Sequence, residues 1–223
     1  MDCIGLVFDF DGTMCRLFKN YNLNQTVAEL HSRMEKYGFY FQLDSDAFDI
    51  FDFIGRQEDL NEAQKRSLYM EMDGVLVSAE KDAVKSCELV QGVSEVMSFL
   101  HKSGFKLGVA TNNSPQCVSE FLKLYCGGLD IPIVGRVGCS PELMKPDKWS
   151  LIEVLKKMNC SVDDAVFFGD TRRDYECALN AGCKFIGVAP TEKKLCRLEK
   201  IRPEIEIVLN FYELKDKLFK TNA

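Results

Sequence analysis

Near its start the chain has a short apolar run, Cys3 to Phe8, followed at once by Asp9, Asp11, Gly12 and Thr13. Such a run is typical of a buried strand, and in open α/β sheets ligands bind just beyond the carboxyl ends of the strands. With two-residue periodicity Asp9 and Asp11 share a side, so one carboxylate can attack while the other transfers protons. Asp-Gly is also the commonest hairpin signal. These residues alone therefore leave a tight turn and a functional site equally open.

From residue 92 onward, helical and strand patterns alternate regularly, which indicates a parallel sheet with helices on its faces. The strands are expected at residues 106–110, 131–134, 165–168, 184–188 and 205–209. The last helix is expected to end at about Phe219. The sequence therefore predicts an α/β fold.

Residues 15–87 have a helical pattern, with apolar stripes at helical spacing through 27–37 and 48–54 and more helical sequence from 61 to 72 and from 75 towards 87. This pattern predicts a helical insertion after the first strand and not another layer of the sheet. Its aromatic side chains are expected to form its own core: Phe39, Tyr40, Phe41, Phe48, Phe51 and Phe53.

Length and charge exclude several classes of protein. A chain of 223 residues can bury the core of one α/β domain with an insertion. The formal net charge of −6 argues against nucleic acid as a partner. No segment has the apolar length that a membrane helix needs, and no basic leader precedes Asp2, so we expect a cytoplasmic protein.

The 10 cysteines include no C-x-x-C pair and no histidine at zinc spacing. We therefore expect reduced cysteines that act as small core residues. Both histidines, His31 and His101, fall within helical patterns far from any strand end. Proton transfer in a site at the strand ends is thus left to carboxylates or lysine.

Four polar clusters fall at strand ends or in the loops after them: Asp9 with Asp11, Thr111 with Asn112, Lys145, and Asp170 with Asp174. A solvated loop explains any one of them, but together they predict a phosphate and metal site. Asp9 and Asp170 offer the hard oxygen ligands that Mg²⁺ prefers. Thr111 and the N–H groups that open the next helix can hold phosphate oxygens. Lys145 can neutralise the phosphate and the crowded carboxylates.

The same stretches resemble the four motifs of the haloacid dehalogenase superfamily, in the family's order: DFDGT at 9–13, ATNNS at 110–114, KPD at 145–147 and GDTRRD at 169–174. The combination is specific, although each piece alone is weak. The helical insertion is similar to the mobile cap of phosphoglycolate phosphatase-like members. The resemblance implies a Rossmann-like three-layer core formed by residues 1–14 and 88–223, with an α-helical cap formed by residues 15–87.

The resemblance also implies a role for each motif residue. Asp9 would be the nucleophile that forms an aspartyl-phosphate, and Asp11 the acid and then the base. Mg²⁺ would be bound by Asp9, the backbone carbonyl of Asp11 and Asp170, with Asp174 supporting the metal site from behind. Phosphate would be bound by Thr111, the Asn112 backbone and Lys145. Branches that cleave carbon–halogen or carbon–phosphorus bonds lack the second acid, so Asp11 favours phosphoester chemistry.

The cap is less familiar than the motifs. Met14, Cys15, Arg16 and Leu17 stand where relatives often carry an acidic residue and a serine, and Lys148 stands where many have proline. Gly55-Arg56 resembles the glycine-containing cap loop of the family. Arg56 would then bind an anionic or hydroxylated substrate, while a solvated arginine at a helix end is an equal alternative.

These patterns predict a Mg²⁺-dependent phosphatase for a small phosphorylated metabolite, acting as a monomer or a homodimer. A sugar phosphomutase is the alternative enzyme, although Thr13 is typical of phosphatases. A regulatory binding module without turnover is the third reading, and the complete motif set argues against it.

Overall fold

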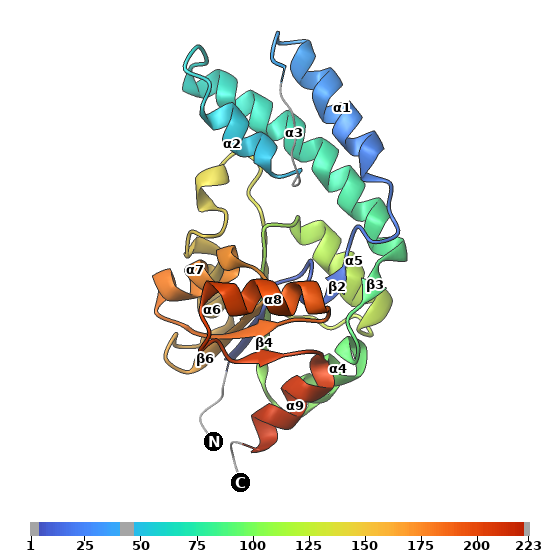
Figure 1. Ribbon diagram of the computed structural model, residues 1–223, viewed down its shortest axis with the longest axis vertical. Coiled ribbons are helices and arrows are strands. Elements are labelled where there is room, and N and C mark those ends of the chain that lie inside the picture. The colour runs from blue at the N-terminus through green and yellow to red at the C-terminus, as the bar shows by residue number, and fades with distance from the viewer. Residues whose placement is uncertain (1–4, 41–46, 221–223) are drawn as a thin grey trace.

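The computed structural model describes residues 5–40 and 47–220. Within this part of the chain, the larger sheet has six strands (Figure 1). Their spatial order is β5 (Ile133–Val134), β4 (Lys106–Ala110), β1 (Gly5–Phe8), β6 (Ala165–Gly169), β7 (Lys184–Val188) and β8 (Ile207–Val208). Every neighbouring pair is parallel, so all these strands end at one edge of the sheet. The predicted α/β class is confirmed.

The helices of the core cover both faces of this sheet. They are α4 (Val93–Lys102), α5 (Pro115–Tyr125), α6 (Trp149–Met158), α7 (Arg172–Ala181), α8 (Glu192–Ile201) and α9 (Phe211–Lys220). In β1, Leu6 and Phe8 face the cluster formed with α4, α5 and α9, whereas Val7 faces the cluster formed with α6 and α7. This two-residue alternation of buried side chains gives a three-layer core.

The predicted strands at 106–110 and 184–188 match β4 and β7, and the strand at 165–168 is one residue longer. The strands expected at 131–134 and 205–209 are shorter, with two residues each in β5 and β8. A short 3-10 turn, η2 (Pro141–Leu143), interrupts the loop between β5 and α6. The part of the first predicted strand before Gly5 lies outside the described residues.

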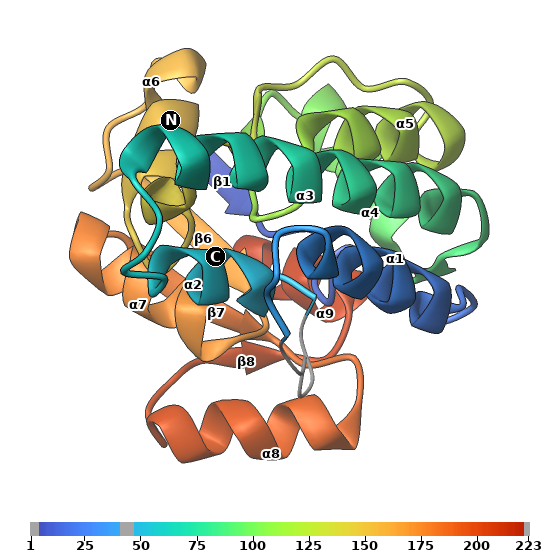
Figure 2. The ribbon, with the colours of Figure 1, turned by 90° about the horizontal axis from the view of Figure 1, so that it is seen from above.

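The insertion contains α1 (Leu23–Glu35), α2 (Asp49–Gly55) and α3 (Glu62–Ala83), which lie together beyond the strand ends (Figures 1 and 2). Their buried side chains form a separate cluster with the partly buried Phe39, Phe48 and Phe53. Phe51 is fully part of this cluster, as predicted. The prediction was wrong for Tyr40, which is 79% exposed because it lies beyond α1, whose buried face ends at Met34. Phe41 lies outside the described residues.

A two-stranded antiparallel ribbon, β2 (Cys15–Arg16) and β3 (Glu88–Leu89), joins the insertion to the core. The expectation of an entirely helical segment was wrong here, because two-residue strands are too short to produce a periodic pattern. The last turn of α3 and the following 3-10 turn, η1 (Val84–Ser86), bury Ala83 and Val84 in the main core cluster. The long helix α3 therefore belongs to both parts of the molecule.

Six of the cysteines are buried, as expected: Cys15, Cys87, Cys117, Cys126, Cys177 and Cys183. Cys139 and Cys160 are half-buried. The prediction of a core residue was wrong for Cys196, which is exposed on α8, and Cys3 lies outside the described residues. No helix in residues 5–40 and 47–220 combines the length and apolar character that a membrane crossing requires.

Candidate active site

Asp9 directly follows β1, and its backbone N–H donates to the Phe168 carbonyl at 2.8 Å, which continues the pairing with β6. Its side chain is 7% exposed. Asp11 follows in a tight turn, where its Oδ1 accepts a hydrogen bond from the Leu17 N–H at 2.8 Å. The Asp-Gly turn does not build a hairpin from β1, whose neighbours are the parallel strands β4 and β6. The turn and the site are therefore the same structure.

Gly12 is required at this turn. Its φ of +99° lies in the region that favours glycine, and an added Cβ would lie only 2.5 Å from Oδ2 of Asp170. The chain can approach the Asp170 carboxylate only because this side chain is absent. Thr13, which is fully buried, donates from Oγ1 to Oδ1 of the same carboxylate at 3.3 Å.

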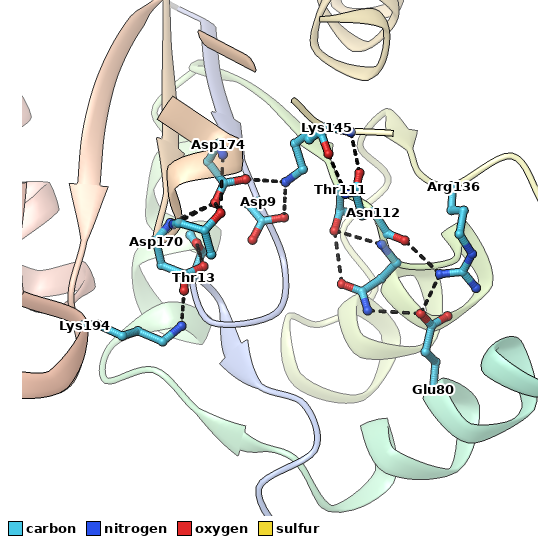
Figure 3. A network of polar contacts seen from close by, with 12 residues as sticks. Asp9, Thr13, Glu80, Thr111, Asn112, Arg136, Lys145, Asp170, Asp174 and Lys194 are labelled. Atoms are coloured by element: carbon cyan, nitrogen blue, oxygen red, sulfur yellow. Dashed lines mark hydrogen bonds and ion pairs between the residues drawn. The ribbon is translucent and has the colours of Figure 1, made fainter. Parts of the chain in front are cut away.

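Lys145 lies between two carboxylates at the centre of the site (Figure 3). Its Nζ is 2.5 Å from Oδ1 of Asp9 and 2.5 Å from Oδ1 of Asp174, and all three side chains are buried. Burial by itself would lower the pKa of Lys145, but the charges of Asp174 and Asp9 raise it. The lysine therefore stays protonated and holds the two acids together.

The two acids respond to this lysine differently. Burial raises the pKa of Asp9, and Lys145 offsets only part of that rise. Burial would also raise the pKa of Asp174, but Lys145 and the hydrogen bonds from Thr171 lower it overall. Thr171 and Asp174 form a capping box at the start of α7, in which Thr171 Oγ1 lies 2.6 Å from Oδ2 of Asp174. The same carboxylate thus begins a helix and orients Lys145.

Asp170 directly follows β6 and is buried beside Asp9. Burial raises its pKa, although Lys194 of α8 contacts its Oδ2. Oxygen atoms of Asp9, Asp170 and Asp174 all lie within 4.8 Å of one another. Three buried carboxylates at this spacing are a hard-oxygen donor set that fits a divalent cation. Asp11 is separate from this group of side chains, and its predicted metal contact would be through the backbone.

Asp11 is partly exposed at the mouth of the site. Burial raises its pKa to about 6, because the hydrogen bond from Leu17 and the charge of Lys194 offset only part of the desolvation. A carboxyl group with this pKa can both donate and accept a proton near neutral pH. Asp9 and Asp11 therefore offer a buried carboxylate and an acid–base group within one turn of chain.

Thr111 and Asn112 directly follow β4, so the structure brings them to the same sheet edge. The Thr111 hydroxyl contacts Oδ1 of Asn113 at 3.2 Å. The Asn112 side chain accepts from the Lys145 N–H at 2.8 Å and donates to the Lys145 carbonyl at 3.2 Å. This amide therefore fixes the loop that carries Lys145, a contact that sequence reasoning did not anticipate.

Sequence reasoning also missed an ion-pair network behind this loop (Figure 3). The buried Arg136 donates to Oε1 of Glu80 at 2.9 Å, to Oδ1 of Asp73 at 2.6 Å and to the Asn112 carbonyl at 2.8 Å. Glu80 in turn accepts from the Asn113 side chain at 3.1 Å and the Ser114 N–H at 2.9 Å. An acid within the apolar stripe of α3 was the available signal, because such a residue needs a buried partner.

A cavity of about 420 Å³ lies between α2 and the core near Lys145. Phe48, Phe51 and Asp52 line it from the insertion, and Lys145 and Arg173 are among its core residues. Arg56 is exposed at the end of α2 and is not part of this lining. The structure thus brings together every predicted motif residue and leaves Arg56 apart from them.

The sequence model of the haloacid dehalogenase-like hydrolase family matches residues 6–188 of the chain. The chain belongs to this family. Family membership confirms the predicted assignment and makes the protein a hydrolase. The pyrophosphatase PpaX of Bacillus mycoides is 26% identical over 203 residues, which cover 89% of this chain and 89% of that protein.

Solved structures share the fold of this chain at lower identity. A predicted phosphatase from Clostridium acetobutylicum has a TM-score of 0.68 at 18% identity, over 98% of this chain and 99% of that chain. CbbY from Rhodobacter sphaeroides in complex with phosphate has a TM-score of 0.65 at 16% identity, over 95% and 96% of the two chains. The family fold therefore extends over the insertion as well as the sheet.

Proposed function

We propose that this hydrolase is a Mg²⁺-dependent phosphatase that acts on a small phosphorylated metabolite through an aspartyl-phosphate. The observation that carries this proposal is the buried Asp9 carboxylate, held 2.5 Å from Lys145 at a strand end beside Asp170 and Asp174. The pyrophosphatase name of the Bacillus relative and the phosphate bound to CbbY support phosphate as the transferred group.

In the first step, an Asp9 oxygen attacks phosphorus as the bond from phosphorus to the leaving oxygen breaks. Asp11 gives its proton to the leaving oxygen, so that an alcohol departs and Asp11 becomes a carboxylate. The raised pKa of Asp11, about 6, supports this role because a fraction of the protein carries the proton near neutral pH.

In the second step, the Asp11 carboxylate takes a proton from water, and the water oxygen attacks phosphorus. The bond between phosphorus and Asp9 then breaks, which releases phosphate and restores both acids. Thr111, the Asn112 backbone and Lys145 would hold the phosphoryl oxygens during both steps. The ammonium of Lys145 also lowers the repulsion between Asp9 and an incoming anion.

Asp9, Asp170 and the Asp11 carbonyl would hold Mg²⁺, and Asp174 would support the site through Lys145 and the start of α7. When bound, Mg²⁺ supplies positive charge close to the phosphoryl oxygens. The proximity of the Asp9, Asp170 and Asp174 carboxylates supports this assignment, since three carboxylates at such spacing share only the cations Lys145 and Lys194, and a further cation would lower their repulsion.

The division into a core of residues 1–14 and 88–223 and a cap of residues 15–87 is part of the same proposal. The separate hydrophobic cluster of α1, α2 and α3 supports it. We further propose that Arg56 contacts substrate when the cap closes, and that the protein acts in the cytoplasm as a monomer or homodimer. The predominantly buried free cysteines support a reducing compartment.

The first experiment compares the wild-type protein with Asp9→Asn on a panel of small phosphate esters, in Mg²⁺ and then in EDTA. Asp9→Asn keeps the shape of the side chain but removes the nucleophilic carboxylate, so we expect phosphate release to fall at least about a thousandfold. Phosphate release by the wild-type protein should also stop in EDTA.

Asp130→Asn is the matched control, because Asp130 is an exposed aspartate outside the four motifs, in the segment between α5 and β5. It should retain the wild-type rate. Substantial turnover by Asp9→Asn would remove Asp9 from the nucleophile's role. No phosphate release by the wild-type protein from any ester would contradict the proposed phosphatase.

A further inference from the structure

A second cavity, of about 530 Å³, opens beside Asp11 on the side away from the Lys145 loop. Asp11 and Asp170 contribute acids to its lining, and Arg172, Lys194, Arg197 and Lys200 contribute cations. A neighbouring cavity of about 220 Å³ shares Asp11 and Lys194 and adds the cations Arg16 and Lys19. The mouth of the site at Asp11 is therefore surrounded by positive charge, in a chain whose formal net charge is −6.

Three of these cations form a row on one face of α8. Lys194, Arg197 and Lys200 follow one another at three-residue spacing, which places them on neighbouring turns of a helix. With a rise of about 1.5 Å per residue, Arg197 lies about 4.5 Å and Lys200 about 9 Å along the helix axis from Lys194. Because Lys194 contacts Asp170, the row begins at the catalytic carboxylates and leads away from them.

Arg197 and Lys200, the cations farther along the row, have no ion-pair partner among the acids of the described residues. Among residues 5–40 and 47–220, no carboxylate lies within 4 Å of the side-chain nitrogens of Arg197 or Lys200. Arg172 has only a loose pair with Glu176, at 3.7 Å, and its own side chain is largely exposed. A cleft lined by one sign of charge concentrates ligands of the opposite sign. An anion bound at Arg197 and Lys200 would meet positive charge that no acid among the described residues neutralises.

We propose that this row binds a second phosphate carried by the leaving group of the substrate, so that the enzyme acts on metabolites with two phosphates. This inference rests on the proposed function, because Asp11 marks the leaving-group side only if it is the acid. The planar guanidinium of Arg197 can bind phosphate through two hydrogen bonds, and Lys200 adds a point charge. A bisphosphorylated sugar and a diphosphate share this chemistry and differ in the spacing of their phosphates.

The test compares kcat/KM for 4-nitrophenyl phosphate, a sugar monophosphate, the matching sugar bisphosphate and inorganic diphosphate. We expect a preference of about tenfold or more for one of the substrates with two phosphates, since hydrogen bonds to charged groups are strong. Arg197→Ala combined with Lys200→Ala should remove about tenfold of that preference, mainly through KM. Of the two substrates with two phosphates, the one whose kcat/KM falls more in the double variant indicates which spacing between the phosphates the row fits.

Lys193→Ala is the control, because Lys193 is an exposed lysine on the same helix that lines neither cavity. It should retain the preference within about twofold. Equal losses on all four substrates in the double variant would overturn the inference, and so would a wild-type protein that does not favour a second phosphate. Hydrolysis of 4-nitrophenyl phosphate in that case would leave the proposed phosphatase intact.

A binding measurement keeps the test independent of turnover. With Asp9→Asn, calorimetry should give a Kd for the sugar bisphosphate about tenfold lower than that for the monophosphate. The difference should disappear when Arg197→Ala and Lys200→Ala are added. If neither the sugar bisphosphate nor diphosphate bound Asp9→Asn more tightly than the sugar monophosphate, the inference would be contradicted even if the rates could not be measured.

Discussion

At the scale of single residues, Lys145 decides whether the site can exist as a buried cluster of acids. Its ammonium is 2.5 Å from one oxygen of Asp9 and 2.5 Å from one oxygen of Asp174. Both carboxylates are buried, so water cannot solvate their charges. The lysine therefore stabilises the fold and prepares the site for an anionic substrate at the same time.

We expect Lys145→Met to lower the free energy of unfolding by about 3–5 kcal/mol at pH 8, because it leaves two buried carboxylates without their cation. The loss should be smaller at pH 5. Burial already raises the pKa of Asp9, and removal of Lys145 would raise it further. A carboxyl whose pKa is raised by folding stabilises the protein below its unfolded pKa of about 3.9, and this contribution is lost as the pH rises through the folded value.

Urea unfolding in EDTA at the two pH values measures this effect without a metal ion that replaces the lost charge. Lys156→Met is the control, since Lys156 forms an exposed pair with Glu153 and should change stability by less than about 1 kcal/mol. A Lys145→Met variant that was equally destabilised at pH 5 and pH 8 would contradict the electrostatic explanation.

The sequence was sufficient to predict the residues at the strand ends, because parallel strands bring their carboxyl ends to one edge. Asp9, Thr111, Lys145 and Asp170 meet there as expected. It was not sufficient for contacts that depend on side-chain direction. The hydrogen bonds between the Asn112 side chain and the Lys145 backbone are such contacts. No pattern in a single sequence indicates which loop an amide side chain will bind.

At the scale of elements, α3 connects the insertion to the loop that follows β4. The part of α3 from Leu68 to Leu76 packs in the insertion's own cluster, whereas Ala83 at the end of the helix is buried in the main core. Asp73 and Glu80, which lie about two turns apart on α3, both bind Arg136. The rings of Phe48 and Phe51 cover the guanidinium, with centroids 5.1 and 5.8 Å away. Both helices α2 and α3 therefore converge on one core arginine.

We expect Glu80→Gln to destabilise the protein by about 3 kcal/mol or more, because it removes one partner of a buried ion pair. The new amide nitrogen would also face a donor, since Glu80 accepts from both Asn113 and Ser114. The loop after β4 would lose its support, so KM for phosphate esters should rise as well. Urea unfolding and steady-state kinetics measure the two effects.

Asp82→Asn provides the comparison on the same helix, because Asp82 pairs with Lys85 at the surface. It should change stability by less than about 1 kcal/mol and leave KM as in the wild type. If Glu80→Gln lowered stability without any change in KM, Glu80 would support the fold but not the proposed binding of phosphate by the loop after β4.

Element prediction succeeded where an apolar pattern was long enough to be periodic. The five-residue strands β4 and β7 were found at their bounds, whereas the two-residue strands β2 and β3 left no periodic trace. The helix α3 runs without a break through Gly74, because tertiary packing outweighs the cost of about 1 kcal/mol for one glycine in a helix. Packing between residues that are distant in the sequence, and not local helix propensity, therefore determines that α3 is continuous.

At the scale of the whole molecule, the fold joins acids that are remote in sequence. Asp9 follows β1 and Asp170 follows β6, and these strands are direct neighbours in the sheet. In the unfolded chain the two carboxylates are far apart, so a divalent cation that binds both of them binds the native state alone. The predicted Mg²⁺ site is thus also a predicted link between distant parts of the chain.

We therefore expect Mg²⁺ to stabilise the native protein. At a concentration of about 100 times its Kd, the gain in the free energy of unfolding should be about 2.7 kcal/mol, with a corresponding rise in Tm between EDTA and Mg²⁺. Asp170→Asn should abolish most of this rise, while Asp163→Asn, at an exposed position before β6, should retain it. Thermal unfolding of the three proteins with and without Mg²⁺ measures the difference. An equal rise in Asp170→Asn and the wild type would place the stabilising metal elsewhere, because a cation at this site loses one of its carboxylate ligands in the variant.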